Sequence, residues 1–132
     1  MEITVSHEQA RVPVLVFHIR GDIDATSYEQ LETQAQTEIQ RGARFLALDL
    51  TDVAYVSSYG VRAISHIFTW LRDLAGGDDD ASLSKGLRDG SYKSRHLKIA
   101  HPSPQVLKML TTVGLDMFLE IHSDLKHALK SF

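Results

Sequence analysis

Two adjacent serines, Ser57 and Ser58, stand between an apolar run at 45–50 and an amphipathic segment at 61–74. The run is short and apolar apart from Asp49, which is typical of a strand buried on both faces. In the segment after it, apolar residues recur at helical spacing with a polar stripe opposite. The serines therefore lie where a strand gives way to a helix N-terminus, whose free N–H groups and dipole favour negative charge. A serine hydroxyl there can cap the helix or accept a phosphate.

Aspartates flank the same junction and the turn before it. Asp49 and Asp52 lie at the end of the apolar run, and Asp22 and Asp24 lie in a Gly-Asp-Ile-Asp turn. A functional interpretation makes one of the first pair a phosphoacceptor or a metal ligand. We favour a structural interpretation, in which Asp49 accepts loop N–H bonds and Asp52 shapes the turn, because aspartate is a routine turn former. Asp22 and Asp24 are expected to act first as turn residues.

Metal and cofactor chemistry has little support in the sequence. Cysteine is absent, which excludes disulfides, thiolate nucleophiles and cysteine metal sites. The acidic run at 78–80 lacks the converging oxygen cage that hard cations need. Seven histidines are scattered without the paired spacing of zinc sites: His7, His18, His66, His96, His101, His122 and His127. Since no Gly-rich phosphate cradle follows a strand either, we expect no metal, no cofactor and no enzymatic activity.

The elements that position the serines follow a regular order. Segments at 3–5 and 12–20 are predicted to pair as an antiparallel hairpin. From the second of these onward, a strand and a helix alternate four times, and each short crossover requires a parallel, right-handed connection. The sequence therefore predicts an α/β fold with a mixed five-stranded sheet, an N-terminal hairpin and about four helices. The remaining strands are expected at 45–50, 96–100 and 118–121, and the helices at 28–39, 61–74, 104–113 and after 123.

Local signals indicate where three of the helices begin. Thr26 and Glu29 fit a capping box for the first helix, in which each side chain bonds a backbone N–H of the other. Ser103 precedes Pro104, the arrangement of an N-cap followed by proline at the first helical position. Ser123 is predicted to cap the last helix.

Length and composition bound the class of protein. The 132 residues suit one domain, which we take as 1–132. A hydrophobic share of 43% and a charged share of 23% are ordinary for soluble globular proteins. The net charge of −3 offers no basic field for nucleic acid or an anionic membrane. With no signal peptide and no apolar run long enough to span a bilayer, we expect a cytoplasmic protein that neither binds nucleic acid nor inserts into membranes.

The segment at 76–95 differs in kind from the rest. Sixteen of its twenty residues are Gly, Asp, Ser, Lys or Arg. It lacks the apolar surface that would offset its ordering entropy. We expect a flexible loop inserted between a helix and a strand.

Four blocks in register carry a further signal. Residues 16–24 look like a strand with a Gly-x-Leu-Asp turn, and 46–51 like a Leu-Asp-Leu-Ser strand. Residues 55–61 stand where an aromatic residue is followed by Ile-Asp-Ser-Ser-Gly-Leu, and 113–118 match a late Gly-Leu…Phe. In this order the blocks resemble the STAS domains, the family of bacterial anti-sigma factor antagonists and of sulfate-transporter cytosolic tails. Almost the whole chain except 76–95 is covered.

The resemblance implies a function. Antagonists of this family are phosphorylated by a partner serine kinase that is itself an anti-sigma factor, and the acceptor position falls on Ser58. The unmodified form binds the kinase and frees the sigma factor, so transcription is regulated indirectly. The implied partner is an anti-sigma factor serine kinase, and the resemblance leaves a homo-oligomer open. The expected partner-binding surface consists of Asp24, Thr26, Ser57, Ser58, Tyr59, Arg62 and His66.

Two departures from the family pattern keep alternatives open. Ser57 replaces the family's aspartate, and Tyr59 replaces its second serine. Ser58 is therefore either a phosphorylation site or a helix cap that is never modified. The alternative function is a STAS subunit of a lipid transporter or of a stress-signalling scaffold, acting without phosphorylation. A response-regulator receiver fits less well, because a hairpin comes first and His122 and Ser123, not a lysine, follow the last strand.

Overall fold

The computed structural model describes residues 1–75 and 93–132. Its sheet has five strands in the order β1-β2-β3-β4-β5. β1 pairs antiparallel with β2, and every later neighbour is parallel. The strands are β1 (Glu2–Gln9), β2 (Pro13–Arg20), β3 (Leu46–Asp52), β4 (Leu97–Ala100) and β5 (Glu120–His122). The helices in the described part are α1 (Tyr28–Gln40), α2 (Ser58–Ala75), α4 (Pro104–Thr112), the 3-10 helix η1 (Leu115–Met117) and α5 (Leu125–Lys130). The predicted mixed sheet with its N-terminal hairpin is confirmed.

The hairpin is longer than the sequence suggested. β1 pairs along its whole length with β2, from Glu2 opposite Arg20 to Gln9 opposite Pro13. Residues 10–12 alone connect the two strands, closed by a 3.1 Å bond from the Ala10 N–H to the Val12 carbonyl. The end of β1, from His7 to Gln9, is polar and exposed, so its strand pattern is weak in the sequence.

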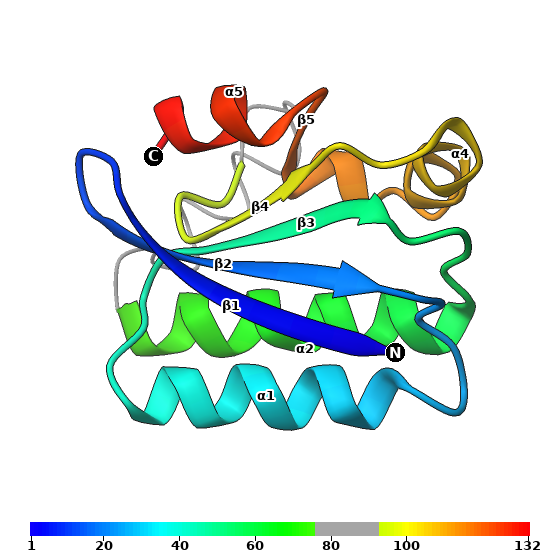
Figure 1. The fold of residues 1–132 in the computed structure, drawn as a ribbon, viewed down its shortest axis with the longest axis horizontal. Helices are drawn as coiled ribbons and strands as arrows, with labels where there is room; N and C mark the ends of the chain where they lie inside the picture. The colour runs from blue at the N-terminus through cyan, green and yellow to red at the C-terminus, as the bar shows by residue number, and fades with distance from the viewer. Residues whose placement is uncertain (76–92) are drawn as a thin grey trace.

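Helices lie on both faces of the sheet, α1 and α2 on one and the short helix α5 on part of the other (Figure 1). α1 and α2 run side by side across one face and pack on alternate residues of β2 and β3. On the other face, Val14, Val16 and Ala47 pack with Phe132 and the short helix α5 into a smaller core. His18 and Asp49 lie on the same face outside this core. Burial on both faces explains why the apolar runs of β2 and β3 are nearly continuous. The large core includes Leu15, Phe17, Ile19, Leu46, Leu48 and Leu50, and the small one Val14, Val16, Ala47 and Phe132.

The capping box predicted for α1 is wrong. The Thr26 hydroxyl donates to Asp24 Oδ1 at 2.7 Å, and no side chain caps the helix at its N-cap residue, Ser27. Glu29 accepts from the Tyr28 hydroxyl instead. The aspartate lies only two residues before Thr26 and holds it in a local turn, which competes with the capping geometry.

The caps of the last two helices differ in outcome. Ser103 Oγ accepts from the Val106 N–H at 3.2 Å, as predicted for α4. The cap predicted at Ser123 is wrong, because Asp124 is the N-cap residue of α5 and accepts from the His127 N–H at 2.8 Å. Both residue types cap well, and the sequence alone does not rank neighbours one position apart.

The expected insertion at 76–95 lies outside the described residues over 76–92. The last residues of that segment, 93–95, are described. Ser94 is buried, donates its N–H to the Phe118 carbonyl at 2.8 Å, and accepts from the N–H groups of His96 and Leu97. Before the segment, Leu74, the last residue of the predicted amphipathic stretch 61–74, is 54% exposed. Among the described helices, none is both long and apolar enough to cross a bilayer.

Candidate functional site

The turn after β2 and the crossing after β3 are joined by backbone hydrogen bonds. The Gly21 N–H donates to the Asp52 carbonyl at 3.1 Å, and the Ile23 N–H donates to the Tyr55 carbonyl at 3.0 Å. The Ser57 N–H donates back to the Ile23 carbonyl at 2.9 Å. The turn at Gly21–Ile23 and the crossing at Asp52–Ser57 are thereby joined into one surface at the carboxyl ends of β2 and β3, which we call the rim. This edge is where open α/β sheets place their sites.

Gly60 allows α2 to start directly against this rim. A Cβ atom on Gly60 would lie 2.6 Å from the Ile23 carbonyl oxygen and 2.8 Å from Val56 Cγ1. Neither contact is possible for a real side chain, so the helix approaches the turn as closely as it does only because residue 60 is glycine. The position of the Ser57–Ser58 pair is fixed by this contact.

The two serines differ in their contacts. Ser57 Oγ accepts from the backbone N–H groups of Tyr59 at 3.2 Å and Gly60 at 3.4 Å, so Ser57 caps α2. Ser58 is the first residue of the helix and is exposed. Within residues 1–75 and 93–132, its hydroxyl makes no hydrogen bond to the protein. The hydroxyl of Ser58 is therefore available for modification without loss of a structural contact.

Asp24 is held rigidly in the turn beside the junction. Its Oδ1 accepts from the Thr26 hydroxyl at 2.7 Å, the Thr26 N–H at 2.9 Å and the Ser27 hydroxyl at 3.3 Å. The hydrogen bonds from Thr26, followed by those from Ser27, lower the pKa of Asp24 below its ordinary value. Asp24 therefore presents a fixed negative charge at the rim, while the exposed Thr26 is oriented by it.

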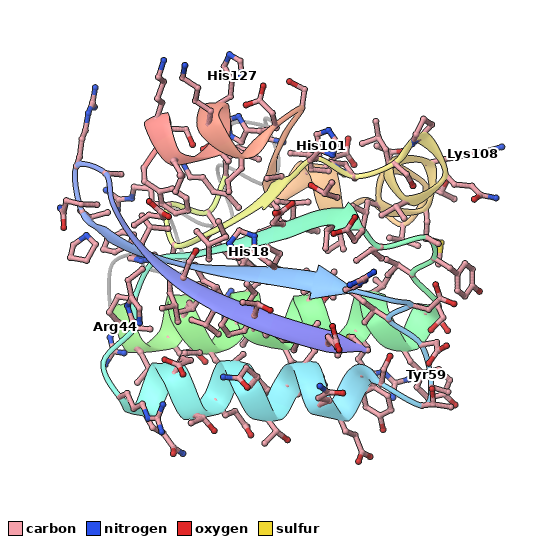
Figure 2. All side chains as sticks on the ribbon, viewed as in Figure 1. His18, Arg44, Tyr59, His101, Lys108 and His127 are labelled. Carbon is pink, nitrogen blue, oxygen red and sulfur yellow. The ribbon has the colours of Figure 1, made fainter. Side chains whose placement is uncertain are left out.

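Tyr59 adds an aromatic surface next to Ser58. Its side chain is 43% exposed, and its ring centroid lies 5.3 Å from that of Tyr28 on α1. The Arg62 guanidinium lies over the same ring at 5.7 Å, a cation–π contact. Figure 2 shows Tyr59 where α1 and α2 begin, at the opposite end of these helices from Arg44. Tyr28 is the first residue of α1, and this position was the signal in the sequence that its ring could reach the rim.

His66 lies apart from the other predicted partner-binding residues. Its Nδ1 is 2.5 Å from Glu32 Oε1 on α1, and its ring lies 5.8 Å from that of Trp70. Eight residues beyond Ser58, it stands about 12 Å farther along the helix axis. The structure thus gathers Asp24, Thr26, Tyr59 and Arg62 near the serines and places His66 on the seam between α1 and α2.

The described part of the chain contains no group of three or more histidines and carboxylates placed to hold a metal ion.

Comparisons with known proteins agree with this architecture. The model of the STAS domain family matches residues 5–77. A protein of Bordetella bronchiseptica, provisionally named anti-sigma factor antagonist BtrV, is 30% identical over 63 residues, or 48% of this chain and 54% of that protein. The chain therefore matches about half the length of this curated relative.

Solved structures show the same fold at low sequence identity. A provisionally named anti-sigma factor antagonist of Thermotoga maritima superposes with a TM-score of 0.71 at 16% identity, covering 97% of this chain and 92% of that one. The antagonist SpoIIAA in its unphosphorylated form gives 0.64 at 15% identity, covering 96% and 93%. The phosphorylated form of SpoIIAA from Bacillus gives 0.63 at 17% identity, covering 96% of both chains.

Proposed function

The chain belongs to the STAS domain family, and on that premise we propose that it is an anti-sigma factor antagonist controlled by phosphorylation at Ser58. The observation that carries the proposal is the division between the two serines. Ser57 caps α2, while the Ser58 hydroxyl is exposed beside it and bonds nothing in the described part of the chain. The naming of the Bordetella relative and the existence of a phosphorylated form of SpoIIAA support this assignment.

A phosphate on Ser58 would be accepted by the local structure. It would bring about −1.5 to −2 charges to the positive end of α2. Arg62 lies one helical turn away, at the spacing where side chains of opposite charge meet. In the described residues no carboxylate lies within ion-pair distance of Arg62, so a phosphate would compete only with the Tyr59 ring. Modification would therefore change the surface and leave the fold intact.

The proposed partner is an anti-sigma factor serine kinase, and the proposed docking surface is the rim around Ser58. Asp24 and Thr26 supply fixed polar contacts from the turn, and Tyr59 and Arg62 supply an aromatic and cationic surface from the helix. Charge placed at the centre of such a surface weakens binding by desolvation and repulsion. The unmodified protein would hold the kinase, and the phosphorylated protein would release it, so transcription would be regulated without an enzymatic step in this chain.

One observation favours a second candidate, a STAS subunit of a lipid transporter or of a stress-signalling scaffold that is never phosphorylated. The residue before the acceptor is Ser57, whose side chain is engaged in the cap, so no carboxylate adjoins Ser58. Tyr59 also places a ring on the other side of the acceptor. A kinase that reads an aspartate beside its target would not recognise this site.

Kinase and binding assays separate the two candidates. The purified protein is incubated with ATP and the kinase-fold anti-sigma factor of the same genome, and phosphate is located by peptide mass spectrometry. Binding is measured by titration calorimetry for Ser58→Ala and Ser58→Asp. Under the first function Ser58 is labelled, the alanine form binds throughout, and the aspartate form does not bind.

Ser65→Ala is the matched control, because Ser65 lies on the same helix and its hydroxyl only donates within the helix, to the Val61 carbonyl at 3.0 Å. The Ser65→Ala variant should be phosphorylated at Ser58 and should bind the kinase like the native chain. Absence of label together with equal affinity of both Ser58 variants would reduce Ser58 to a surface residue and favour the second candidate.

A further inference from the structure

Three polar side chains on the sheet face opposite α1 and α2 form a continuous hydrogen-bonded chain. Ser6 Oγ lies 2.9 Å from His18 Nε2, and His18 Nδ1 lies 2.8 Å from Asp49 Oδ2. Each residue belongs to a different strand, β1, β2 and β3 in that order. Figure 2 shows His18 on the side of the sheet away from α1 and α2. These three side chains are separate from the rim around Ser58.

Strand register brings these residues together. His18 is the pairing partner of Asp49 in the parallel β2–β3 ladder. On the other side, His18 pairs with Thr4, so Ser6 is its diagonal neighbour on the same face. A slip of one residue in either ladder would send one of the three side chains to the opposite face. The arrangement is therefore a fixed property of the sheet.

The protonation pattern follows from Asp49. Its Oδ1 accepts from the Thr51 N–H at 3.1 Å and the Thr51 hydroxyl at 2.5 Å. Partial burial raises the pKa of Asp49, but the hydrogen bonds from Thr51 and His18 outweigh it and leave the pKa below its ordinary value. An ionised carboxylate only accepts, so the proton of a neutral His18 ring sits on Nδ1. His18 Nε2 then accepts from the Ser6 hydroxyl.

A hydroxyl bonded to a base that is itself oriented by a carboxylate is the arrangement of an activated nucleophile. Solvent reaches it: the His18 side chain is 36% exposed and Ser6 is half-buried, while the Asp49 side chain is 14% exposed. The face is an open sheet surface, which suits a small acyl group with a good leaving group. No large substrate is required for such a step.

We propose that Ser6 is a site of covalent acylation by small activated esters or thioesters, with His18 as general base and Asp49 as a positioning residue. Ser6 Oγ forms a bond to the acyl carbon as its proton passes to His18 Nε2. The bond from the acyl carbon to the leaving oxygen or sulfur breaks, and the proton moves from Nε2 to the leaving group. The products are an ester on Ser6 and a free alcohol or thiol.

The experiment uses the full chain and 4-nitrophenyl acetate as the probe. Release of 4-nitrophenol gives the rate, and peptide mass spectrometry locates the acetyl group. We expect one acetyl group on Ser6 in the native chain and none in Ser6→Ala. In His18→Ala the rate of acetylation should fall by at least about 100-fold, since general base catalysis contributes about 10²–10⁴-fold. Asp49→Asn should also slow acetylation, because the preferred tautomer is lost. Thr4→Ala, on the same face, is the matched control and should react like the native chain.

Added imidazole distinguishes a chemical role of His18 from a structural one. It should restore acetylation of Ser6 in His18→Ala and should have no such effect on Ser6→Ala. Acetylation of Ser6 at the native rate in His18→Ala without imidazole would overturn the proposal. Acetyl groups found only on lysines or on His18 would overturn it as well.

Discussion

Gly60→Ala is the change that tests most directly how the Ser58 junction is built. Two effects oppose each other at this position. Alanine is better than glycine inside a helix by about 1 kcal/mol. Against this, the new Cβ would lie 2.6 Å from the Ile23 carbonyl oxygen and 2.8 Å from Val56 Cγ1. The first contact is to backbone, which cannot rotate away as a side chain would.

The steric effect should outweigh the helix propensity. Overpacking in a closely packed site costs about 1–3 kcal/mol. The Ile23 carbonyl also accepts the Ser57 N–H at 2.9 Å, so moving it weakens a hydrogen bond worth about 1 kcal/mol. After subtraction of the propensity gain, we expect a net loss of about 1–3 kcal/mol. For a domain of this size that corresponds to a Tm lower by roughly 3–10 °C.

Urea unfolding followed by circular dichroism measures the difference, with Ser65→Ala as the matched control on the same helix. The control changes helix propensity without adding an atom and should stay within about 0.5 kcal/mol of the native chain. Gly60→Ala should also bind the partner more weakly, because the turn that carries Asp24 must move. If Gly60→Ala proved as stable as the native chain, the close approach to Ile23 would not be what positions α2.

Three further predictions concern stability. Ser94→Ala should cost about 1–3 kcal/mol in chemical denaturation, because the N–H groups of His96 and Leu97 lose their acceptor. Replacing 77–91 with a short Gly/Ser linker should leave the Tm nearly unchanged, since that composition cannot support a core, and a loss of several degrees would show that the segment packs on the domain. The pKa of Asp49 is below its ordinary 3.8, so its contribution is complete above that value and is lost as pH falls through the lowered pKa. Asp49→Asn should therefore be less stable at neutral pH and should show a shallower loss of stability in acid titrations monitored by fluorescence.

The order of strands and helices could be predicted because it rests on burial. β2 and β3 each contain a nearly continuous apolar run, and α1 and α2 carry apolar stripes at helical spacing, so these elements can be recognised from the sequence pattern. Short crossovers then leave few topologies. The capping residues could not be predicted as well. At Thr26 the choice depends on whether the side chain bonds Asp24 or the helix, two states of similar free energy set by local backbone angles.

The position of Ser58 could be predicted for the same reason as the fold, but its surroundings could not. Contacts such as Tyr28 with Tyr59 depend on how two helices pack, which a sequence pattern does not specify. The bond between His18 and Asp49 depends on strand register. In both pairs the residues are 31 positions apart in the sequence, and only the three-dimensional structure shows that they are in contact.

The replacement of the family's aspartate by Ser57 alters the electrostatics of the site more than its structure. Serine and aspartate cap helices about equally well, and Ser57 retains the bond to the Tyr59 N–H. A carboxylate beside Ser58, however, would repel an incoming phosphate by on the order of 1 kcal/mol at a partly solvated surface. Without that carboxylate, the positive end of α2 and Arg62 would attract a phosphate on Ser58, and Asp24 on the neighbouring turn would be the remaining negative charge at the rim. Under the proposed function, the substitution that removes a recognition feature for a kinase would therefore make Ser58 a more favourable place for the phosphate once it is attached.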